Sequence, residues 1–326
     1  MDWQKILQNI DKLDESKFLK ELDVLEQCNL CPRNCNANRF SGKFGYCNAG
    51  TGFSISSICN HRGEEPVISG PYGICNIFFT NCNLQCVYCQ NYQISQNTGD
   101  YRHDNMDFKT VLREIVFILM NSGMKIVGFV SPGHFIPHMK AIIKALNSLG
   151  LELTYVYNSN GFDKVETLKE LEGLIDVYMP DFKYADNDLS EKLSGAKDYT
   201  EIALKALKEM YRQIGNAFIV DNSGYLMRGI LIRHLVLPSH AENSKEVLKM
   251  IADVSLKLHI SLMSQYQPNI YVKDIPGLSG TVKSEEYYEV VDFMQQAGFT
   301  NAYIQEMSSA ANYNPDFRKN HPFERM

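Results

Sequence analysis

The sequence contains no long apolar run and no cluster of basic residues. Its 326 residues have a formal net charge of −6, and the Lys and Arg residues are spread along the chain. The absence of a basic stretch disfavours a nucleic-acid partner held through its phosphates. Without a run of about 18 apolar residues, a membrane span is not expected. The first residues lack an apolar signal segment. We therefore expect a soluble, cytoplasmic protein with no membrane partner.

Nine cysteines are present, and in a reducing compartment they are better explained as metal ligands than as disulfides. Cys82, Cys86 and Cys89 have the spacing CxxxCxxC. A [4Fe-4S] cluster normally takes four thiolates, so three would leave one iron open to a cofactor or substrate. The alternative is a closed zinc site or a disulfide. It needs a further ligand, and the residues 90–92 supply no Cys or His.

This motif, with the aromatic Tyr88 before its last cysteine, resembles the signature of radical S-adenosylmethionine (SAM) enzymes. The likeness runs from about Cys28 to about Pro268. It is greatest to the activating enzymes, such as the pyruvate formate-lyase activating enzyme, and to their homologues with an N-terminal Cys-rich segment. The resemblance implies SAM as cofactor and a low-potential electron donor such as flavodoxin or ferredoxin. It also implies a 5′-deoxyadenosyl radical that abstracts hydrogen from the substrate.

A second set of cysteines lies near the N-terminus, at Cys28, Cys31, Cys35 and Cys47, with Gly and Pro residues between and around them. Four thiolates in a segment rich in turns suit one tetrahedral metal centre. Either a second iron–sulfur cluster or a structural zinc satisfies this pattern, because thiolates alone do not distinguish the two. Residues 1–73 are therefore predicted to form a helical and Cys-rich metal-binding module.

Apolar runs rich in β-branched and aromatic residues alternate with segments of helical period from residue 74 to residue 310. Expected strands are 74–79, 125–130, 152–157, 174–179, 229–237, 260–265 and 301–304. Expected helices are 107–122, 135–149, 163–172, 198–214, 243–257 and 284–297. This order predicts an α/β fold, a partial (β/α)6 TIM-like barrel of the radical SAM type, followed by a tail at 311–326.

Polar residues follow several of these strands, and in a barrel such strand ends meet at one mouth. Ser131 and His134 follow the second strand, Asn158 and Asn160 the third, and Asp181 and Lys183 the fourth; Arg233 lies on the fifth. Since Arg233 and His234 are adjacent on a strand, only one can face the mouth, and we favour Arg233.

The resemblance implies that these residues bind SAM. Lys183 suits the cofactor carboxylate as a point charge, Arg233 would lie near the cofactor, and Tyr88 beside the adenine. The family's Gly-Gly-Glu, which holds the cofactor amine, is replaced by residues 131–134, so Ser131 or backbone carbonyls would take that place. Asn158 replaces an Asp, which weakens or removes the family's monovalent-cation site. The alternatives are an Asp181–Lys183 pair at the rim and a structural, buried His134.

Three functions remain compatible with the sequence. The first is a radical enzyme that installs a glycyl radical on a partner protein. The second is the same chemistry on a small molecule, a peptide or another protein side chain. The third is a non-catalytic iron–sulfur or zinc protein that senses redox state. The polar residues at successive strand ends argue against the third, because a sensor does not need them.

Overall fold

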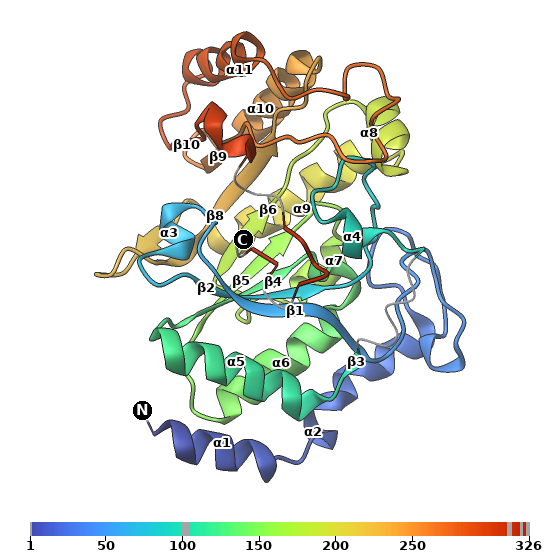
Figure 1. Cartoon of the computed structure of the whole chain (residues 1–326), viewed down its shortest axis with the longest axis vertical. Coiled ribbons are helices and arrows are strands. Elements are labelled where there is room, and N and C mark those ends of the chain that lie inside the picture. Colours follow the sequence, from blue (N-terminus) through green and yellow to red (C-terminus); the bar gives the residue numbers. More distant parts are fainter. Residues whose placement is uncertain (1, 99–104, 312–314, 320–321, 324–326) are drawn as a thin grey trace.

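The computed structural model describes residues 2–98, 105–311, 315–319 and 322–323 (Figure 1). In this part of the chain, ten strands form one sheet in the order β10-β9-β8-β6-β5-β4-β2-β1-β3, with β7 paired to β8. The strands are β1 (Phe53–His61), β2 (Ile74–Phe79), β3 (Asn105–Met106), β4 (Ile126–Val130), β5 (Thr154–Ser159), β6 (Val177–Pro180), β7 (Phe218–Val220), β8 (Leu226–Leu235), β9 (His259–Met263) and β10 (Ala302–Ile304).

The helices alternate with these strands through most of the chain. They are α1 (Trp3–Asp11), α2 (Ser16–Leu19), α3 (Pro66–Ser69), α4 (Tyr92–Ser95), α5 (Phe108–Ser122), α6 (Ile136–Ser148), α7 (Val165–Lys169), α8 (Asn187–Ser194), α9 (Tyr199–Ile214), α10 (Ala241–Val254) and α11 (Ser284–Gln296). All neighbouring pairs from β2 to β10 along the sheet are parallel. The predicted partial TIM-like barrel of the radical SAM type is thereby confirmed.

Helix α5 illustrates how the sequence sets the limits of an element. The Asp107 side chain accepts a hydrogen bond from the Thr110 backbone N–H and caps the first turn. Gly123 ends the helix with φ 74°, a left-handed conformation that glycine adopts without a Cβ clash. The face with Val111, Ile115 and their neighbours is buried. Caps at both ends and one apolar face therefore place α5 against the sheet, as the 107–122 period predicts.

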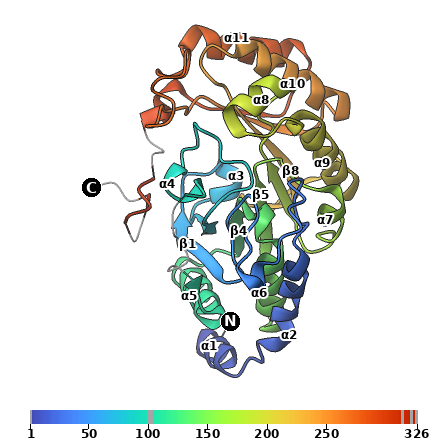
Figure 2. The same cartoon turned by 90° about the vertical axis from the view of Figure 1, so that its right-hand side faces the viewer.

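The N-terminal module adds a strand to the sheet that the sequence did not lead us to expect. Strand β1 pairs antiparallel with β2, with Cys59 opposite Asn76. A register shift between Ile55 and Ser57 interrupts the two-residue alternation of buried side chains. This bulge explains why β1 has no clear strand pattern. Helices α1 and α2 lie beside α5 and α6, at the end of the molecule remote from α10 and α11 (Figures 1 and 2).

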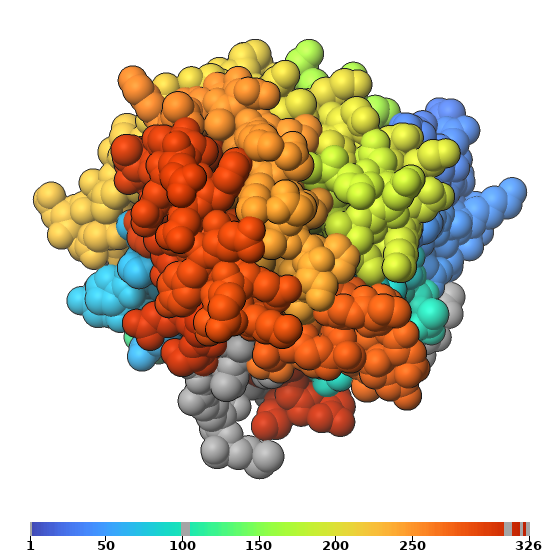
Figure 3. Space-filling model, turned by 90° about the horizontal axis from the view of Figure 1, so that it is seen from above, coloured from blue at the N-terminus to red at the C-terminus, as the bar shows by residue number. Residues whose placement is uncertain are grey.

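The C-terminal part closes the other end of the molecule. Seen from above, the orange and red surface of the C-terminal third covers much of this end (Figure 3). Of the predicted tail, residues 312–314, 320–321 and 324–326 lie outside the described part. The described residues Phe317 and Phe323 return to the sheet and pack against the ring of Phe78, with centroids 5.4 and 5.2 Å away. The tail thus lies close to the carboxyl end of β2.

Candidate active site

The CxxxCxxC loop follows β2, at the carboxyl end of the parallel strands. Asn81 and Gln85 have φ of 66° and 61°, so the backbone turns sharply on either side of Cys82. Cys82, Cys86 and Cys89 line the same cavity, which has a volume of about 180 Å³. The structure therefore brings the three predicted ligands to one space at the mouth of the barrel.

Hydrogen-bond donors lie close to two of these sulfur atoms. Ser194 Oγ is 2.9 Å from Cys86 Sγ, and Asn160 Nδ2 is 3.5 Å from Cys82 Sγ. Burial raises the pKa of the Cys86 thiol to about 12, so a metal must displace its proton to bind. Donors directed at sulfur stabilise the thiolate that this exchange produces. The site therefore fits a cluster held by thiolates.

No group of three or more His, Cys, Asp or Glu within the described ranges has the arrangement of ligands to one metal ion. An iron–sulfur cluster has a different requirement, because each cysteine binds a different iron.

The polar residues predicted from the strand ends meet the cysteine loop in this cavity. They come from the carboxyl ends of β4, β5, β6 and β8. The cavity wall includes Tyr88, Ser131, Asn158, Asn160, Asp181, Lys183 and Arg233. Of the eight predicted cofactor-binding residues, seven line the cavity.

His134 is the exception, and its placement corrects the prediction. The side chain is fully buried and does not line the cavity. Its Nε2 lies 2.9 Å from the Thr80 carbonyl oxygen, and its own carbonyl accepts a hydrogen bond from Arg39. Burial lowers the pKa of His134 to about 3, so the ring is neutral. His134 is the last residue of the 3₁₀ turn Pro132–His134, and its ring packs against Phe135 behind the cavity wall.

Asp181 and Lys183 form an ion pair within the cavity wall. Burial lowers the pKa of Lys183, but the Asp181 carboxylate outweighs this effect and holds the pKa well above its usual range. Lys183 is therefore a cation at neutral pH. Asp181 and Lys183 pair with each other and also line the cavity. A pair at the rim of the barrel is therefore compatible with a place in the cofactor site.

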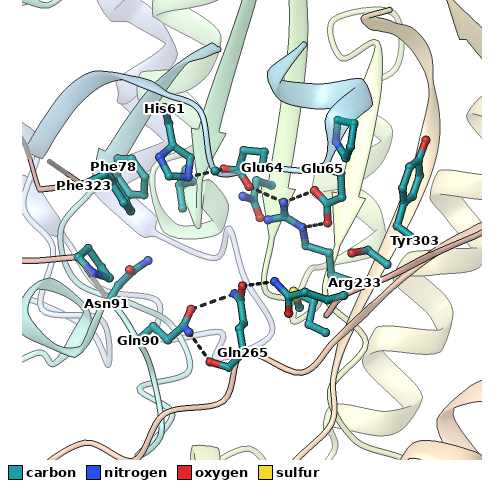
Figure 4. A pocket seen from close by; sticks show the side chains of 18 of the residues that line it. His61, Glu64, Glu65, Phe78, Gln90, Asn91, Arg233, Gln265, Tyr303 and Phe323 are labelled. Atoms are coloured by element: carbon teal, nitrogen blue, oxygen red, sulfur yellow. Dashed lines mark hydrogen bonds and ion pairs between the residues drawn. The ribbon is translucent and has the colours of Figure 1, made fainter. Parts of the chain in front are cut away.

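A second cavity of about 320 Å³ adjoins the first and shares part of its wall, including Gln90, Asn158, Arg233 and Gln265. We call it the outer chamber. Its own wall includes His61 at the end of β1, the turn with Glu64 and Glu65, Tyr303 of β10, and Phe323. Figure 4 shows these side chains around one space. Gln90 and Gln265 hydrogen-bond to each other at its base.

Arg233 pairs with both glutamates of the outer chamber. Its Nε donates to Glu65 Oε1 at 2.9 Å, and its Nη2 contacts Glu64 and Glu65 (Figure 4). Burial raises the pKa of Glu64, but Arg233 and His61 oppose it and leave the pKa at about 2. His234 points away and bonds Phe182 and Ser244. The choice of Arg233 as the residue facing the mouth is confirmed.

The four N-terminal cysteines line a separate small cavity, of about 10 Å³. Arg39 Nη2 lies 3.1 Å from Cys28 Sγ and 3.7 Å from Cys47 Sγ. A Cβ at Gly45 would meet Cys35 Sγ at 2.8 Å, so only glycine fits there. The shared cavity and the donor to two of the sulfurs suit a thiolate-bound centre, although among the described residues the four thiols do not have the arrangement of ligands to a single metal ion.

A protein-family model matches the part of the chain that contains the cysteine loop. The model described as Radical SAM superfamily matches residues 76–226. This part of the chain is therefore similar to the radical SAM superfamily. The match begins in β2, contains the cysteine loop and the polar residues after β4, β5 and β6, and ends at the start of β8. The N-terminal cysteines and Arg233 lie outside it.

Individual proteins match longer stretches of the chain than the family model does. An uncharacterized protein, MJ0674, of Methanocaldococcus jannaschii is 29% identical over 279 residues, which cover 84% of this chain and 76% of the relative. SuiB of Streptococcus suis, solved with its precursor peptide SuiA, matches with a TM-score of 0.50 and 15% identity over 75% of this chain. The chain covers 52% of SuiB, about half its length. The likeness to SuiB concerns the fold alone.

A domain of the pyruvate-formate lyase-activating enzyme of Bacteroides vulgatus also matches. Its TM-score is 0.37 and its identity 17%, over 52% of this chain and 93% of that domain.

Several residues of the candidate site have no local sequence pattern that would have revealed them. Asn97 accepts a hydrogen bond from the Cys82 backbone N–H and donates to the Cys82 carbonyl. Ser194 reaches Cys86 from the end of α8. Glu64 and Glu65 lie in the short turn after β1, and the structure places both in the wall of the outer chamber. Within the described residues, we find no helix long and apolar enough to span a bilayer.

Proposed function

We propose that the chain is a radical SAM enzyme in which Cys82, Cys86 and Cys89 hold a [4Fe-4S] cluster with one iron open to SAM. The main supporting observation is that the three thiols and the strand-end polar residues line one cavity, which adjoins a second chamber. A protein that binds the cluster and SAM without catalysis needs only the cavity of the cysteine loop. The adjoining chamber supports a reaction on a second molecule.

The cofactors, when bound, supply a 5′-deoxyadenosyl radical that abstracts a hydrogen atom from the substrate. We propose that residues of the cavity wall bind and orient SAM. Lys183 would bind the methionine carboxylate of SAM, while Ser131, Asn158 and Asn160 offer polar contacts to the rest. Asp181 holds Lys183 in place. Tyr88 is buried against Tyr184 and Tyr266, with ring centroids 6.4 Å from each, and would flank the adenine.

The substrate is either a glycine Cα of a partner protein, as in an activating enzyme, or a small molecule or peptide. The outer chamber has a volume of about 320 Å³, the size of a small ligand site. It would accept a small molecule or one peptide segment but not a folded domain. We propose a flavodoxin or ferredoxin as the electron donor and a cytoplasmic location.

We further propose that Cys28, Cys31, Cys35 and Cys47 hold a second metal centre, either a [4Fe-4S] cluster or a structural zinc. Metal analysis of the Cys82→Ala/Cys86→Ala/Cys89→Ala triple variant distinguishes these. Remaining iron and sulfide indicate a second cluster, and zinc alone indicates a structural site. A variant with neither metal would contradict the proposal.

SAM cleavage tests the enzymatic function directly. Reconstituted without oxygen and reduced with dithionite, the wild type should convert SAM to methionine and 5′-deoxyadenosine, detected by mass spectrometry. Cys82→Ala should lose both the cluster and cleavage. Cys59→Ala, which changes a cysteine of β1 outside both cysteine sets, should retain them. An intact cluster that forms no 5′-deoxyadenosine would exclude the enzyme and leave a redox sensor.

A glycyl radical distinguishes the two substrate classes. Electron paramagnetic resonance on mixtures with co-purified partner proteins should show its doublet if the chain is an activating enzyme. Deuterium exchange between 5′-deoxyadenosine and a small molecule or peptide alone would favour the second class.

A further inference from the structure

The outer chamber is placed to hold the group that reacts with the radical. It shares Arg233, Asn158 and other wall residues with the cavity of the cysteine loop, so a molecule bound in it lies next to the proposed SAM site. Neither Glu64 nor Glu65 lines the inner cavity. The charges of the two glutamates are therefore presented to the outer chamber, on the substrate's side.

The charges of the ionised groups in the wall of the outer chamber do not sum to zero. Glu64 and Glu65 contribute two carboxylates and Arg233 one guanidinium. Burial lowers the pKa of His61, so that ring is neutral. Among the described residues, the others that line the chamber, from Gly63 to Phe323, have no charge at neutral pH. One negative charge is left in a buried wall, where an uncompensated charge is costly.

Glu64 and Glu65 differ in the number of groups that bond to their carboxylates. Glu64 accepts a hydrogen bond from Asn76 Nδ2 at 2.7 Å, contacts Arg233 and lies 3.9 Å from His61 Nε2. Within the described part of the chain, both oxygens of Glu65 are bonded by the Arg233 guanidinium alone. Since a carboxylate has about four acceptor positions, Glu65 keeps capacity for a further donor.

The rest of the wall favours a cation over an anion. Phe78, Tyr303 and Phe323 line the chamber, and aromatic faces attract cations. Arg233 is the only cationic residue among the described residues of the wall, and the two carboxylates occupy its Nε and Nη2. An anionic group would meet Glu64 and Glu65 beside this arginine.

We propose that the substrate carries a cationic group, an ammonium or a guanidinium, which binds in the outer chamber against Glu65. The cation would supply the missing positive charge and donate to the free acceptor positions of the carboxylate. This inference rests on the proposed function, because it takes the adjoining cavity as the site of SAM.

Matched probes test the charge of the ligand without turnover. Cluster-loaded protein with SAM, kept oxidised under anaerobic conditions, is titrated with n-butylammonium, n-butylguanidinium, butyrate and n-butanol. Binding is followed by saturation-transfer NMR. At least one cation should bind about tenfold more tightly than butanol, and butyrate more weakly still. Equal binding of butanol, or tighter binding of butyrate, would overturn the proposal.

Variants locate the contact. Glu65→Gln keeps the size of the side chain and should abolish the preference for the cation, whereas Glu65→Asp should retain part of it. Glu152→Gln, at an exposed position, is the control and should bind as the wild type does. Circular dichroism of each variant checks the fold. A preference that survives in folded Glu65→Gln would overturn the assignment.

SAM affinity in the same variants separates the cofactor from the substrate. Equilibrium dialysis should give equal SAM affinity for the wild type and Glu65→Gln. A loss in the variant would mean that Glu65 holds the ammonium of SAM, which would overturn the proposal. Because probe binding needs no reductant, a protein that binds butylammonium through Glu65 but never cleaves SAM would refute the proposed function and not the chamber's preference.

Discussion

Arg33 connects the two cysteine sets through a hydrogen bond to Asn83. Its Nε donates to the Asn83 carbonyl oxygen at 2.9 Å, and its guanidinium lies 3.7 Å from the centre of the Tyr46 ring. Asn83 lies between Cys82 and Cys86, whereas Arg33 lies between Cys31 and Cys35. Tyr46 in turn donates from its hydroxyl to the Leu84 carbonyl. The N-terminal Cys segment therefore supports the CxxxCxxC loop directly.

Arg33→Ala should weaken cluster binding by this loop. Without the guanidinium the Asn83 carbonyl loses its donor, and the loop gains freedom before the metal binds. We expect lower iron and sulfide content per chain and faster loss of the cluster's visible absorbance in air. Arg113→Ala removes an exposed arginine paired with Asp11 and is the matched control. Equal content and equal decay in the two variants would show that the contact is dispensable.

Lys183→Gln should reduce the affinity for SAM about tenfold or more, because it removes the charge that we propose to bind the cofactor carboxylate. It also leaves the Asp181 carboxylate without its partner. Equilibrium dialysis with cluster-loaded, unreduced protein measures the effect. Lys183→Arg, which keeps the charge, should lose less, and the exposed Lys197→Gln should match the wild type. Unchanged affinity in Lys183→Gln would remove Lys183 from the proposed SAM site.

The sequence predicts those parts of the fold and site that depend on local pattern. Strand 74–79 coincides with β2, and the polar residues after β4, β5 and β6 reach one cavity because parallel strands end on the same side. Local sequence pattern does not predict contacts between segments that are far apart in the sequence. Arg39 bonds the carbonyl of His134, 95 positions along the chain, and no local period encodes such a partner. His134 was assigned to the cofactor for that reason.

Gly161→Ala should destabilise the protein and disturb Asp181. Gly161 has φ 80°, and a Cβ there would overlap the Asp181 carbonyl oxygen and lie 2.7 Å from the Tyr199 hydroxyl. Left-handed backbone costs a non-glycine residue about 1–3 kcal/mol, and the overlap adds to this. Gly173→Ala is a close control, because Gly173 has φ 78° with open space around it. Urea unfolding should show the larger loss at Gly161; similar losses would mean that the overlap is relieved by small shifts.

His234 should make the stability depend on pH in the acid range. Burial lowers its pKa from 6.5 to about 4 in the folded chain. Between these values the unfolded chain takes up a proton that the folded chain does not. The stabilising contribution is therefore complete above about pH 6.5 and decreases as the pH falls toward 4, by on the order of 3 kcal/mol.

His234→Gln removes this titration. Urea unfolding at several pH values, compared between the variant and the wild type, should show a smaller decline from pH 6.5 to 4 in the variant. Parallel curves would mean that the unfolded and folded states bind this proton alike. His134 and His138, with pKa values lowered to about 3 by burial, remain in both proteins, so the difference reports on His234.

Strand β1 ends at His61, and the same short stretch of backbone leads into Glu64 and Glu65. A polypeptide trimmed to residues 76–226 would keep the CxxxCxxC loop, Asp181 and Lys183, yet it would lack these three side chains as well as Arg233. Such a fragment would keep most of the wall around the three cysteines and lose the charged side chains of the neighbouring chamber. Complete walls for both spaces thus require chain on either side of the family-matched region.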